Sequence, residues 1–199
     1  MSRYNGSLTR EQFMFREMRM VAQLYKKGQN TSQIIESVMR ENLFQYPTER
    51  EVKGKCRVAL RRLEMISSSE TLLGLLAEGT LREAKQAALV AMMCDSQLLA
   101  DFMVEVVGEK YRRLEMTITR KDVNLFFEQL REREQAVGEW SDSTVRRIRS
   151  VLMNVLRENG YLEGIGSEEL VPVLISEEFE TALRAAGLRG FLPAFNILE

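Results

Sequence analysis

The chain has 199 residues, enough for one large domain or two small ones. Hydrophobic residues make up 45% and charged residues 29%, the mixture expected of a globular protein that buries a core. The formal net charge is −1, so a nucleic-acid site would have to come from uneven placement of charge and not from a bulk excess of cations.

The residue types exclude several classes of chemistry. Histidine is absent, which excludes Ser-His-Asp and Cys-His nucleophiles, histidine metal ligands and the commonest general base. Cys56 and Cys94 lie far apart and form no C-x-x-C motif, so neither a disulfide framework nor a thiolate zinc site is expected. We therefore expect no enzyme activity, no catalytic residue, no cofactor and no metal site. A carboxylate-dependent nuclease is the remaining enzyme alternative.

Targeting and membrane signals are also missing from the sequence. The segment Met1–Gly6 lacks the apolar core of a signal peptide, and the longest apolar run, Ala87–Cys94, is far shorter than the roughly 18 residues that cross a bilayer. We expect a cytoplasmic protein with no membrane partner.

Helix-start signals recur along the chain, mostly a Ser or Thr followed by an apolar stripe at helical spacing, and glycines or Pro47 follow several of these stripes. The start near residue 141 is assigned to Ser141 or Ser143. In chain order we expect helices over about 9–27, 31–42, 48–66, 70–78, 80–93, 96–109, 119–136, 141–158 and 176–186, then an apolar stretch at 191–195 that docks onto the body of the protein.

Only Tyr161–Ile165 and Leu170–Ile175 resemble strands, with Gly166 and Ser167 between them. The expected fold class is therefore all-α or nearly so, with at most one small β-hairpin near residues 161–175. The polar joint at residues 67–69 suggests two parts, 1–68 and 69–199, each with a helix-turn-helix-like element and packed together as one globular unit.

The first helix-turn-helix-like element consists of the helices at 31–42 and 48–66, separated by a break at Pro47. On a helical wheel the second helix places its apolar residues on one side and a basic face on the other. The basic face consists of Arg50, Lys53, Arg57 and Arg61. This arrangement makes the second helix the candidate DNA-contacting element.

The second element consists of the helices at 119–136 and 141–158. The exposed side of its second helix collects hydroxyls, guanidinium groups and an amide, which are donors suited to phosphates and base edges. The residues proposed to contact DNA there are Ser143, Arg146, Arg147, Ser150 and Asn154.

A third basic stretch covers residues 110–121, where five cations face a single acid, Glu115. Its candidate DNA contacts are Lys110, Arg112, Arg113, Arg120 and Lys121. Residues 158–183, by contrast, contain seven acids and no base. The plain alternative for all these segments is solvated surface, and a protein-binding face is a further alternative for the acidic one.

Several segments resemble one known family, the BrxA proteins of BREX (bacteriophage exclusion) systems. The resemblance extends over essentially the whole chain and is carried by Tyr4–Thr9, Glu41–Arg50, Phe102–Tyr111, the helix start at Trp140–Ser141 and Leu192–Asn196.

The resemblance implies a small, helical, non-enzymatic component of a phage-resistance operon that binds double-stranded DNA through helix-turn-helix-like elements. It also implies other BREX proteins as partners, among them a methyltransferase and an ATPase. We thus expect a non-catalytic accessory protein with little sequence specificity for DNA. A scaffold for the methyltransferase and ATPase, or an RNA-binding helical bundle, are the alternatives. A monomer is expected because the sequence has no sustained heptad seam.

Overall fold

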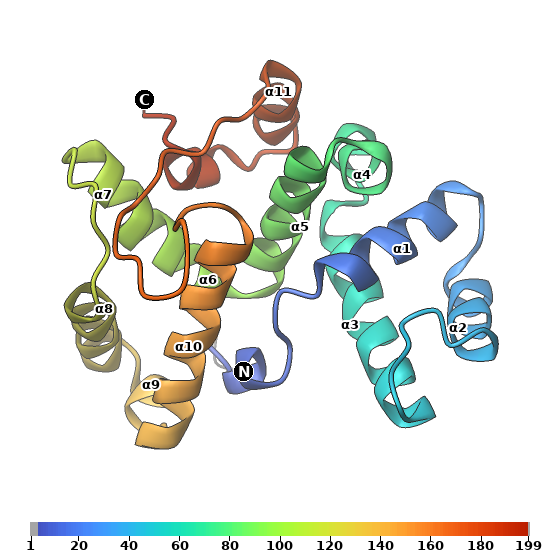
Figure 1. Ribbon diagram of the computed structural model, residues 1–199, viewed down its shortest axis with the longest axis horizontal. Helices are drawn as coiled ribbons and strands as arrows, with labels where there is room; N and C mark the ends of the chain where they lie inside the picture. Colours follow the sequence, from blue (N-terminus) through green and yellow to red (C-terminus); the bar gives the residue numbers. More distant parts are fainter. Residues whose placement is uncertain (1–3, 199) are drawn as a thin grey trace. The chain divides into compact units, whose positions relative to one another are not determined.

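Helices make up most of the computed structural model, which describes residues 4–198, and the longest stretch without a helix covers residues 159–176 (Figure 1). Among these residues no regular β-strand forms. Extended segments pair only at two isolated bridges, Thr117 with Glu169 and Leu162 with Leu170. The all-α prediction is therefore confirmed, and the small hairpin considered near residues 161–175 is reduced to the Leu162–Leu170 bridge.

The chain divides into two units whose segments alternate along the sequence. Unit 1 contains the chain up to Gln12, Ser96–Ile175 and the stretch from Gly187 onward, whereas unit 2 contains Phe13–Asp95 and Ser176–Ala186. This division does not fall at the predicted boundary between residues 68 and 69. The polar joint at 67–69 lies within unit 2 because the helices on both of its sides pack on the same neighbouring helices.

Unit 2 is built around α1, which packs against both α3 and α4, while α3 and α4 each pack on α5. The helix α2 packs on α3, and α11 returns from much later in the sequence to pack on α4. The bounds in this unit are α1 (Phe15–Lys26), α2 (Thr31–Arg40), α3 (Glu49–Ile66), α4 (Glu70–Glu78), α5 (Leu81–Asp95) and α11 (Glu177–Ala185).

Unit 1 contains one continuous helical stretch, residues 97–112, whose middle section is a π-helix, and this section packs against the C-terminal 3-10 helix η3. The helix α8 also packs on the π-helix, and α10 packs on the N-terminal turn η1. The bounds are η1 (Gly6–Thr9), α6 (Gln97–Asp101), the π-helix η2 (Phe102–Gly108), α7 (Glu109–Arg112), α8 (Arg120–Arg133), α9 (Gln135–Gly138), α10 (Asp142–Glu158) and η3 (Arg189–Phe195).

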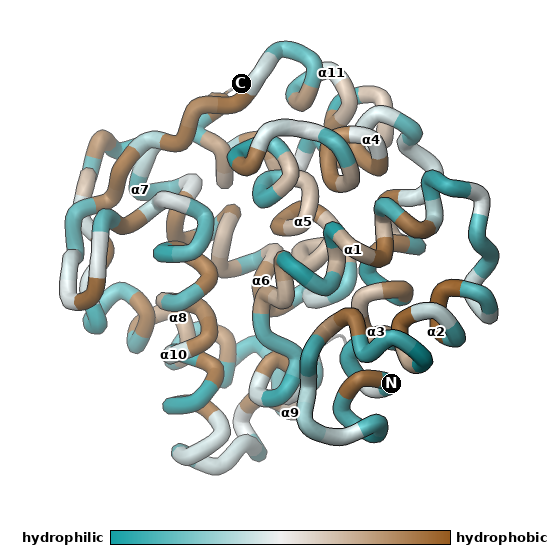
Figure 2. Tube along the Cα trace, turned by 45° about the vertical axis from the view of Figure 1, so that its right-hand side comes forward, coloured by the Kyte–Doolittle hydropathy of each residue, from teal (hydrophilic) through white to brown (hydrophobic). Residues whose placement is uncertain are grey.

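Apolar and polar residues alternate along the surface helices at the spacing that produces amphipathic faces (Figure 2). In α3 the predicted apolar face, which includes Val52, Cys56 and Leu63, is buried. In α10 the predicted face is buried as well, including Ile148 and Leu152. The C-terminal segment docks as expected, since Leu192 and Phe195 of η3 are almost fully buried.

Most of the predicted helix starts are confirmed by their capping hydrogen bonds. The side chains of Thr48, Ser69, Thr119 and Ser176 each accept a hydrogen bond from an amide of the first helical turn. Ser141, and not Ser143, caps α10. The amides of the first helical turn have no carbonyl acceptor within the helix. The oxygen of an N-cap side chain accepts one of these hydrogen bonds, which is why such residues mark helix starts reliably.

One predicted helix start and one predicted cap residue are wrong. Thr9 does not open α1, because its hydroxyl donates to the carbonyl oxygen of Gly6 at 2.8 Å and closes the short turn η1. The helix α1 begins only at Phe15, after Met14 with a left-handed φ of 54°. Thr31 is the first residue of α2 and not its cap, since Asn30 forms the capping box with Gln33.

Within residues 4–198 no single helix is long and apolar enough to cross a membrane. The consecutive stretches Leu81–Asp95 and Gln97–Arg112 reach that length and hydropathy only when they are taken together, and the helix is broken between them.

Candidate nucleic-acid interface

The basic face of α3 is exposed as the helical wheel predicts. Arg50, Lys53 and Arg57 follow one another at helical spacing on the side of α3 that points away from its buried residues. No salt bridge to these three side chains is found in the described part of the chain. Their positive charges therefore remain available to an anionic partner.

Arg61, the fourth residue predicted on this face, is engaged differently. Its guanidinium holds the carboxylate of Asp95 in α5 through two hydrogen bonds of 2.7 and 2.8 Å. Arg62, which the wheel did not single out, contacts the same carboxylate at 3.3 Å and also donates to the carbonyl oxygen of Phe13 at 3.2 Å. The end of the predicted basic face is thus an ion-pair cluster that ties α3 to α5.

Burial by itself would raise the pKa of Asp95, but hydrogen bonds and charge from Arg61, and then from Arg62, outweigh it and hold the pKa below its usual value. The carboxylate is therefore ionised at neutral pH. Its negative charge offsets the positive charge of Arg61, which the helical wheel placed on the DNA-binding face.

The face of α10 is exposed over most of the residues predicted for it. Arg146, Arg147 and Ser150 are exposed on the side opposite the buried Ile148 and Leu152. Arg146 donates to the Asp142 carbonyl of its own helix at 3.4 Å, and no salt bridge to it occurs among the described residues.

The three smaller polar residues predicted on α10 make local hydrogen bonds. The hydroxyl of Ser143 lies 2.9 Å from that of Ser141 at the helix start, and Ser150 donates to the carbonyl oxygen of Arg146 at 3.1 Å. The amide oxygen of Asn154 accepts from Arg157 at 2.9 Å. All three predicted residues are exposed, so these bonds are open to exchange with water or with a ligand.

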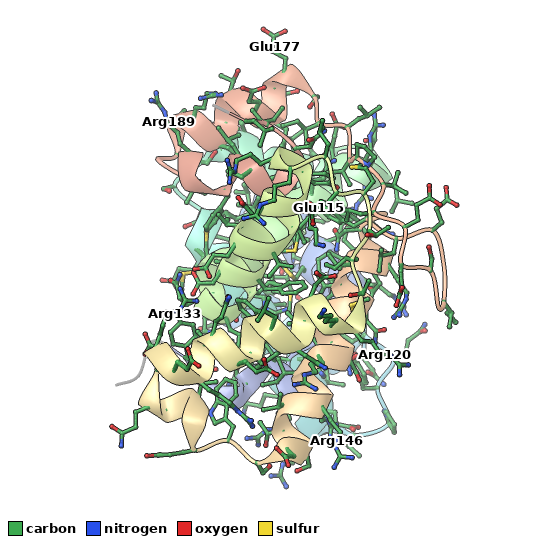
Figure 3. The ribbon with its side chains drawn as sticks, turned by 90° about the vertical axis from the view of Figure 1, so that its left-hand side faces the viewer. Glu115, Arg120, Arg133, Arg146, Glu177 and Arg189 are labelled. Atoms are coloured by element: carbon green, nitrogen blue, oxygen red, sulfur yellow. The ribbon has the colours of Figure 1, made fainter. Side chains whose placement is uncertain are left out.

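The helix α8 crosses α10 in unit 1 (Figure 3). The two helices are joined by the Arg149 guanidinium, which lies 5.4 Å from the centre of the Phe127 ring, and by the Arg131–Asp142 ion pair at 3.4 Å. Arg120 and Lys121 are exposed in the first turn of α8. Figure 3 shows Arg120 and Arg146 on the same side of this pair of helices. Unit 1 therefore presents cations from two crossing helices.

Lys110 does not belong to this exposed set. Its side chain is only 16% exposed, and its ammonium group lies 2.9 Å from Asp122 and 3.0 Å from Glu115. Burial would lower the pKa of Lys110, but its hydrogen bonds to Asp122 and Glu115 outweigh that effect and raise it. Asp122 also closes the capping box of α8 with Thr119, so Lys110 fixes the start of α8.

Arg112 and Arg113 share one carboxylate within the chain, which offsets part of their charge. Both contact the carboxylate of Glu109, Arg112 through two hydrogen bonds and Arg113 at 2.7 Å. The hydrogen bonds from these two guanidinium groups lower the pKa of Glu109 to about 2, with Arg112 having the larger effect. Of the five cations predicted in residues 110–121, only Arg120 and Lys121 are exposed without a carboxylate partner among the described residues.

The order helix, connection, basic helix is present in both predicted elements. The connection between α2 and α3 covers residues 41–48, and that between α8 and α10 covers residues 134–141, including α9. Both exceed the turn of about three or four residues in a helix-turn-helix motif. The assignment of these elements as helix-turn-helix-like therefore stays a prediction.

No cluster of three or more residues suited to hold a metal ion occurs within residues 4–198. Cys56 and Cys94 are free, and burial raises the pKa of each thiol to about 11. Such thiols are protonated at neutral pH and are poor nucleophiles.

The chain is similar to known proteins over almost its whole length. The BrxA family model matches residues 2–187. A BREX protein BrxA from Bacillus cereus is 29% identical over 92% of each chain, and one from Escherichia coli is 26% identical over 98% of this chain and 89% of the relative.

A BREX protein BrxA from Paramagnetospirillum magneticum is 28% identical over 92% of this chain and 90% of that protein. The crystal structure of an uncharacterised protein from Magnetospirillum magneticum superposes with a TM-score of 0.81, at 26% identity and 98% coverage of both chains. The resemblance inferred from the sequence is thereby confirmed, and the chain belongs to the BrxA family of BREX proteins.

Proposed function

We propose that this chain is a non-catalytic accessory component of a BREX phage-defence system and that it binds double-stranded DNA with little sequence specificity. The observation that carries the proposal is a set of exposed cations, on three amphipathic helices, for which residues 4–198 provide no carboxylate partner. They are Arg50, Lys53 and Arg57 on α3, Arg120 and Lys121 on α8, and Arg146 and Arg147 on α10.

Cations held in place on helices suit the phosphate backbone of a duplex, which presents closely spaced negative charges. Phosphate contacts position a protein on DNA but carry no sequence information directly. The exposed Ser143, Ser150 and Asn154 add neutral donors beside the α10 arginines, and such groups also hydrogen-bond to phosphates. A surface of this composition supports affinity for duplexes in general.

A salt series with labelled duplexes of unrelated sequence tests the proposal. If about six phosphates are contacted, log K should fall with log salt with a slope of about −5, and the slope should be the same for every duplex sequence. Fluorescence anisotropy measures both quantities. Binding that is absent, or that does not depend on salt, would contradict the proposal.

Three further experiments separate the alternative functions. Stronger binding to structured RNA than to duplex DNA in direct competition would replace the proposal with an RNA-binding role. Cleavage of DNA when magnesium is added would show that the protein is an enzyme. Retention of purified methyltransferase or ATPase components by nuclease-treated protein, without any DNA affinity, would favour a scaffold.

A further inference from the structure

Unit 1 contains a π-helical section, η2, within the helical stretch of residues 97–112. π-Helices are rare in proteins and occur frequently at functional sites. The cations proposed to contact DNA lie on α3, α8 and α10 and not on η2. The π-helix therefore indicates a candidate site that is separate from the proposed DNA surface.

A cavity lies beside this π-helix, where η2 and α7 face η3. Its volume is about 410 Å³, within the range of pockets that bind small molecules. Its apolar lining includes Val104 of η2, Leu192 and Pro193 of η3, and Leu198. Leu192 is buried and Leu198 is 47% exposed, so apolar surface extends from the interior of the cavity to its edge.

The walls of the cavity are held close to each other by Gly108 and Pro193, which both line it. An added Cβ atom at Gly108 would lie only 2.8 Å from the Cβ atom of Pro193, so no space remains for a further carbon atom between the two residues. A ligand would therefore enter a cavity that already exists, which lowers the cost of binding.

The ionised side chains in the cavity lining are those of Glu109, Arg112 and Arg189. With two cations and one acid, the lining has a net charge of +1. Glu109 accepts hydrogen bonds from Arg112 and also from Arg113, which lies outside the lining. An anion placed beside Arg112 would be repelled by Glu109, so Arg112 is the less suitable of the two cations.

Arg189 is the cation that suits an anionic ligand. It is exposed and takes part in no salt bridge found within residues 4–198. Figure 3 shows Arg189 pointing outward from η3. The cavity thus combines an apolar interior with one guanidinium group at its edge that has no carboxylate partner in the described part of the chain.

We propose that this cavity binds a small organic anion. The apolar body of the ligand lies against Val104, Leu192 and Leu198, and its anionic group accepts a hydrogen bond from the guanidinium of Arg189. Burial of apolar surface and a charge-assisted hydrogen bond then act on the same molecule. A DNA phosphate lacks the apolar body, and none of the cations proposed to contact DNA lines the cavity.

Two fluorescent probes with the same aromatic body test the proposal. Anilinonaphthalene sulfonate carries an anionic group, whereas phenylnaphthylamine has the same rings without it, and both become brighter in apolar surroundings. Titration of the full chain, freed of nucleic acid, should give a dissociation constant of about 10–100 µM for the sulfonate. The neutral probe should bind about fivefold to tenfold more weakly.

A change at Arg189 tests the position of the anionic group. Arg189→Gln should weaken binding of the sulfonate about threefold to tenfold and leave the neutral probe unchanged, because it removes only the charge at the edge of the cavity. Arg120→Gln is the matched control, since Arg120 is an exposed arginine of unit 1 that does not line the cavity. This control should change the binding of neither probe.

A change at Leu198 tests the position of the apolar body. Leu198→Asp should weaken binding of both probes about tenfold, because it replaces apolar surface with a carboxylate. Leu114→Asp is the matched control, since Leu114 is an exposed leucine of unit 1 outside the cavity lining. Circular dichroism of each variant verifies that a loss of binding is not a loss of structure.

Three results would overturn the proposal. The first is an unaltered chain that brightens neither probe, and the second is sulfonate binding that Leu198→Asp leaves unchanged. The third is an Arg189→Gln variant that weakens both probes equally, since the guanidinium would then not recognise the anionic group. Duplex binding is measured separately, so failure here leaves the proposed function in place.

Discussion

Asp95 lies between two arginines whose surroundings differ sharply. The side chain of Arg61 is 42% exposed, whereas those of Arg62 and Asp95 are 1% and 9% exposed. An ion pair with an exposed partner contributes little to stability, but removing one member of a buried pair leaves a charge without compensation. The two arginines should therefore respond differently to the loss of their partner.

Asp95→Ala should lower the free energy of unfolding by about 3–5 kcal/mol, because it removes the carboxylate that contacts the buried Arg62 guanidinium. Arg61→Ala should lower it by less, because Arg62 still contacts the carboxylate and no buried cation loses its partner. Urea unfolding followed by circular dichroism measures both values. Equal losses of unfolding free energy in the two variants would show that the buried Arg62–Asp95 pair does not explain the effect.

The same cluster has a defined pH dependence. The pKa of Asp95 is lower in the folded chain than its usual value, so its contribution is fully present above the unfolded pKa and is lost as the pH falls through the folded one. The difference in stability between the unaltered chain and Asp95→Ala should be constant at neutral pH and shrink below about pH 4. A difference that stays constant down to pH 2 would contradict this explanation.

At the scale of elements, the contact between η2 and η3 depends on the absence of a side chain. A Cβ atom added at Gly108 would lie 2.8 Å from the Cβ of Pro193, closer than real Cβ atoms approach a neighbour, and 3.0 Å from its carbonyl carbon, which is also unusually tight. Because one of these atoms belongs to the backbone, η3 would have to move to make room.

Gly108→Ala should therefore destabilise the protein by about 1–3 kcal/mol, even though alanine favours helices. Gly54→Ala is the matched control, since Gly54 lies within the exposed part of α3 and an added Cβ would meet nothing within 4 Å. That substitution should stabilise the protein by about 0.5–1 kcal/mol. Thermal or urea unfolding of the two variants should thus shift in opposite directions, and a stabilising effect at Gly108 would refute the close packing.

At the scale of the whole molecule, the net charge of −1 conceals cations of two kinds. Arg146 and Arg147 have no carboxylate partner among the described residues, whereas Arg112 and Arg113 share Glu109. Net charge alone would make the two pairs equivalent for DNA binding. If the position and pairing of each cation determine DNA affinity, only the cations without a carboxylate partner contribute phosphate contacts.

Replacing Arg146 and Arg147 together by Gln should weaken duplex binding about tenfold at moderate salt and reduce the salt slope by about 2. Arg112→Gln with Arg113→Gln changes the net charge by the same amount and should leave the slope nearly unchanged. Anisotropy titrations of both double variants, with circular dichroism to verify folding, provide the comparison. Equal effects would mean that bulk charge, and not the α10 face, governs binding.

Local signals in the sequence determined most of the helices of this protein. Cap residues such as Thr48 and Ser176 and the apolar stripes of α3 and α10 act over a few residues, so they can be read without knowledge of the rest of the chain. The family, too, was identified from short segments distributed along the chain. Thr9 shows where such local signals fail, because its hydroxyl bonds to the Gly6 carbonyl in η1 and does not cap a helix.

Only the tertiary structure decided which cations remain available. The partners of Arg61 and Lys110 lie on neighbouring helices, at Asp95 and Asp122, and a helical wheel considers one helix at a time. The alternation of the two units along the chain was likewise invisible, because α11 packs on α4 from about a hundred residues away. The sequence thus determined a helical protein with basic faces, and long-range packing decided how much of that charge faces solvent without a partner.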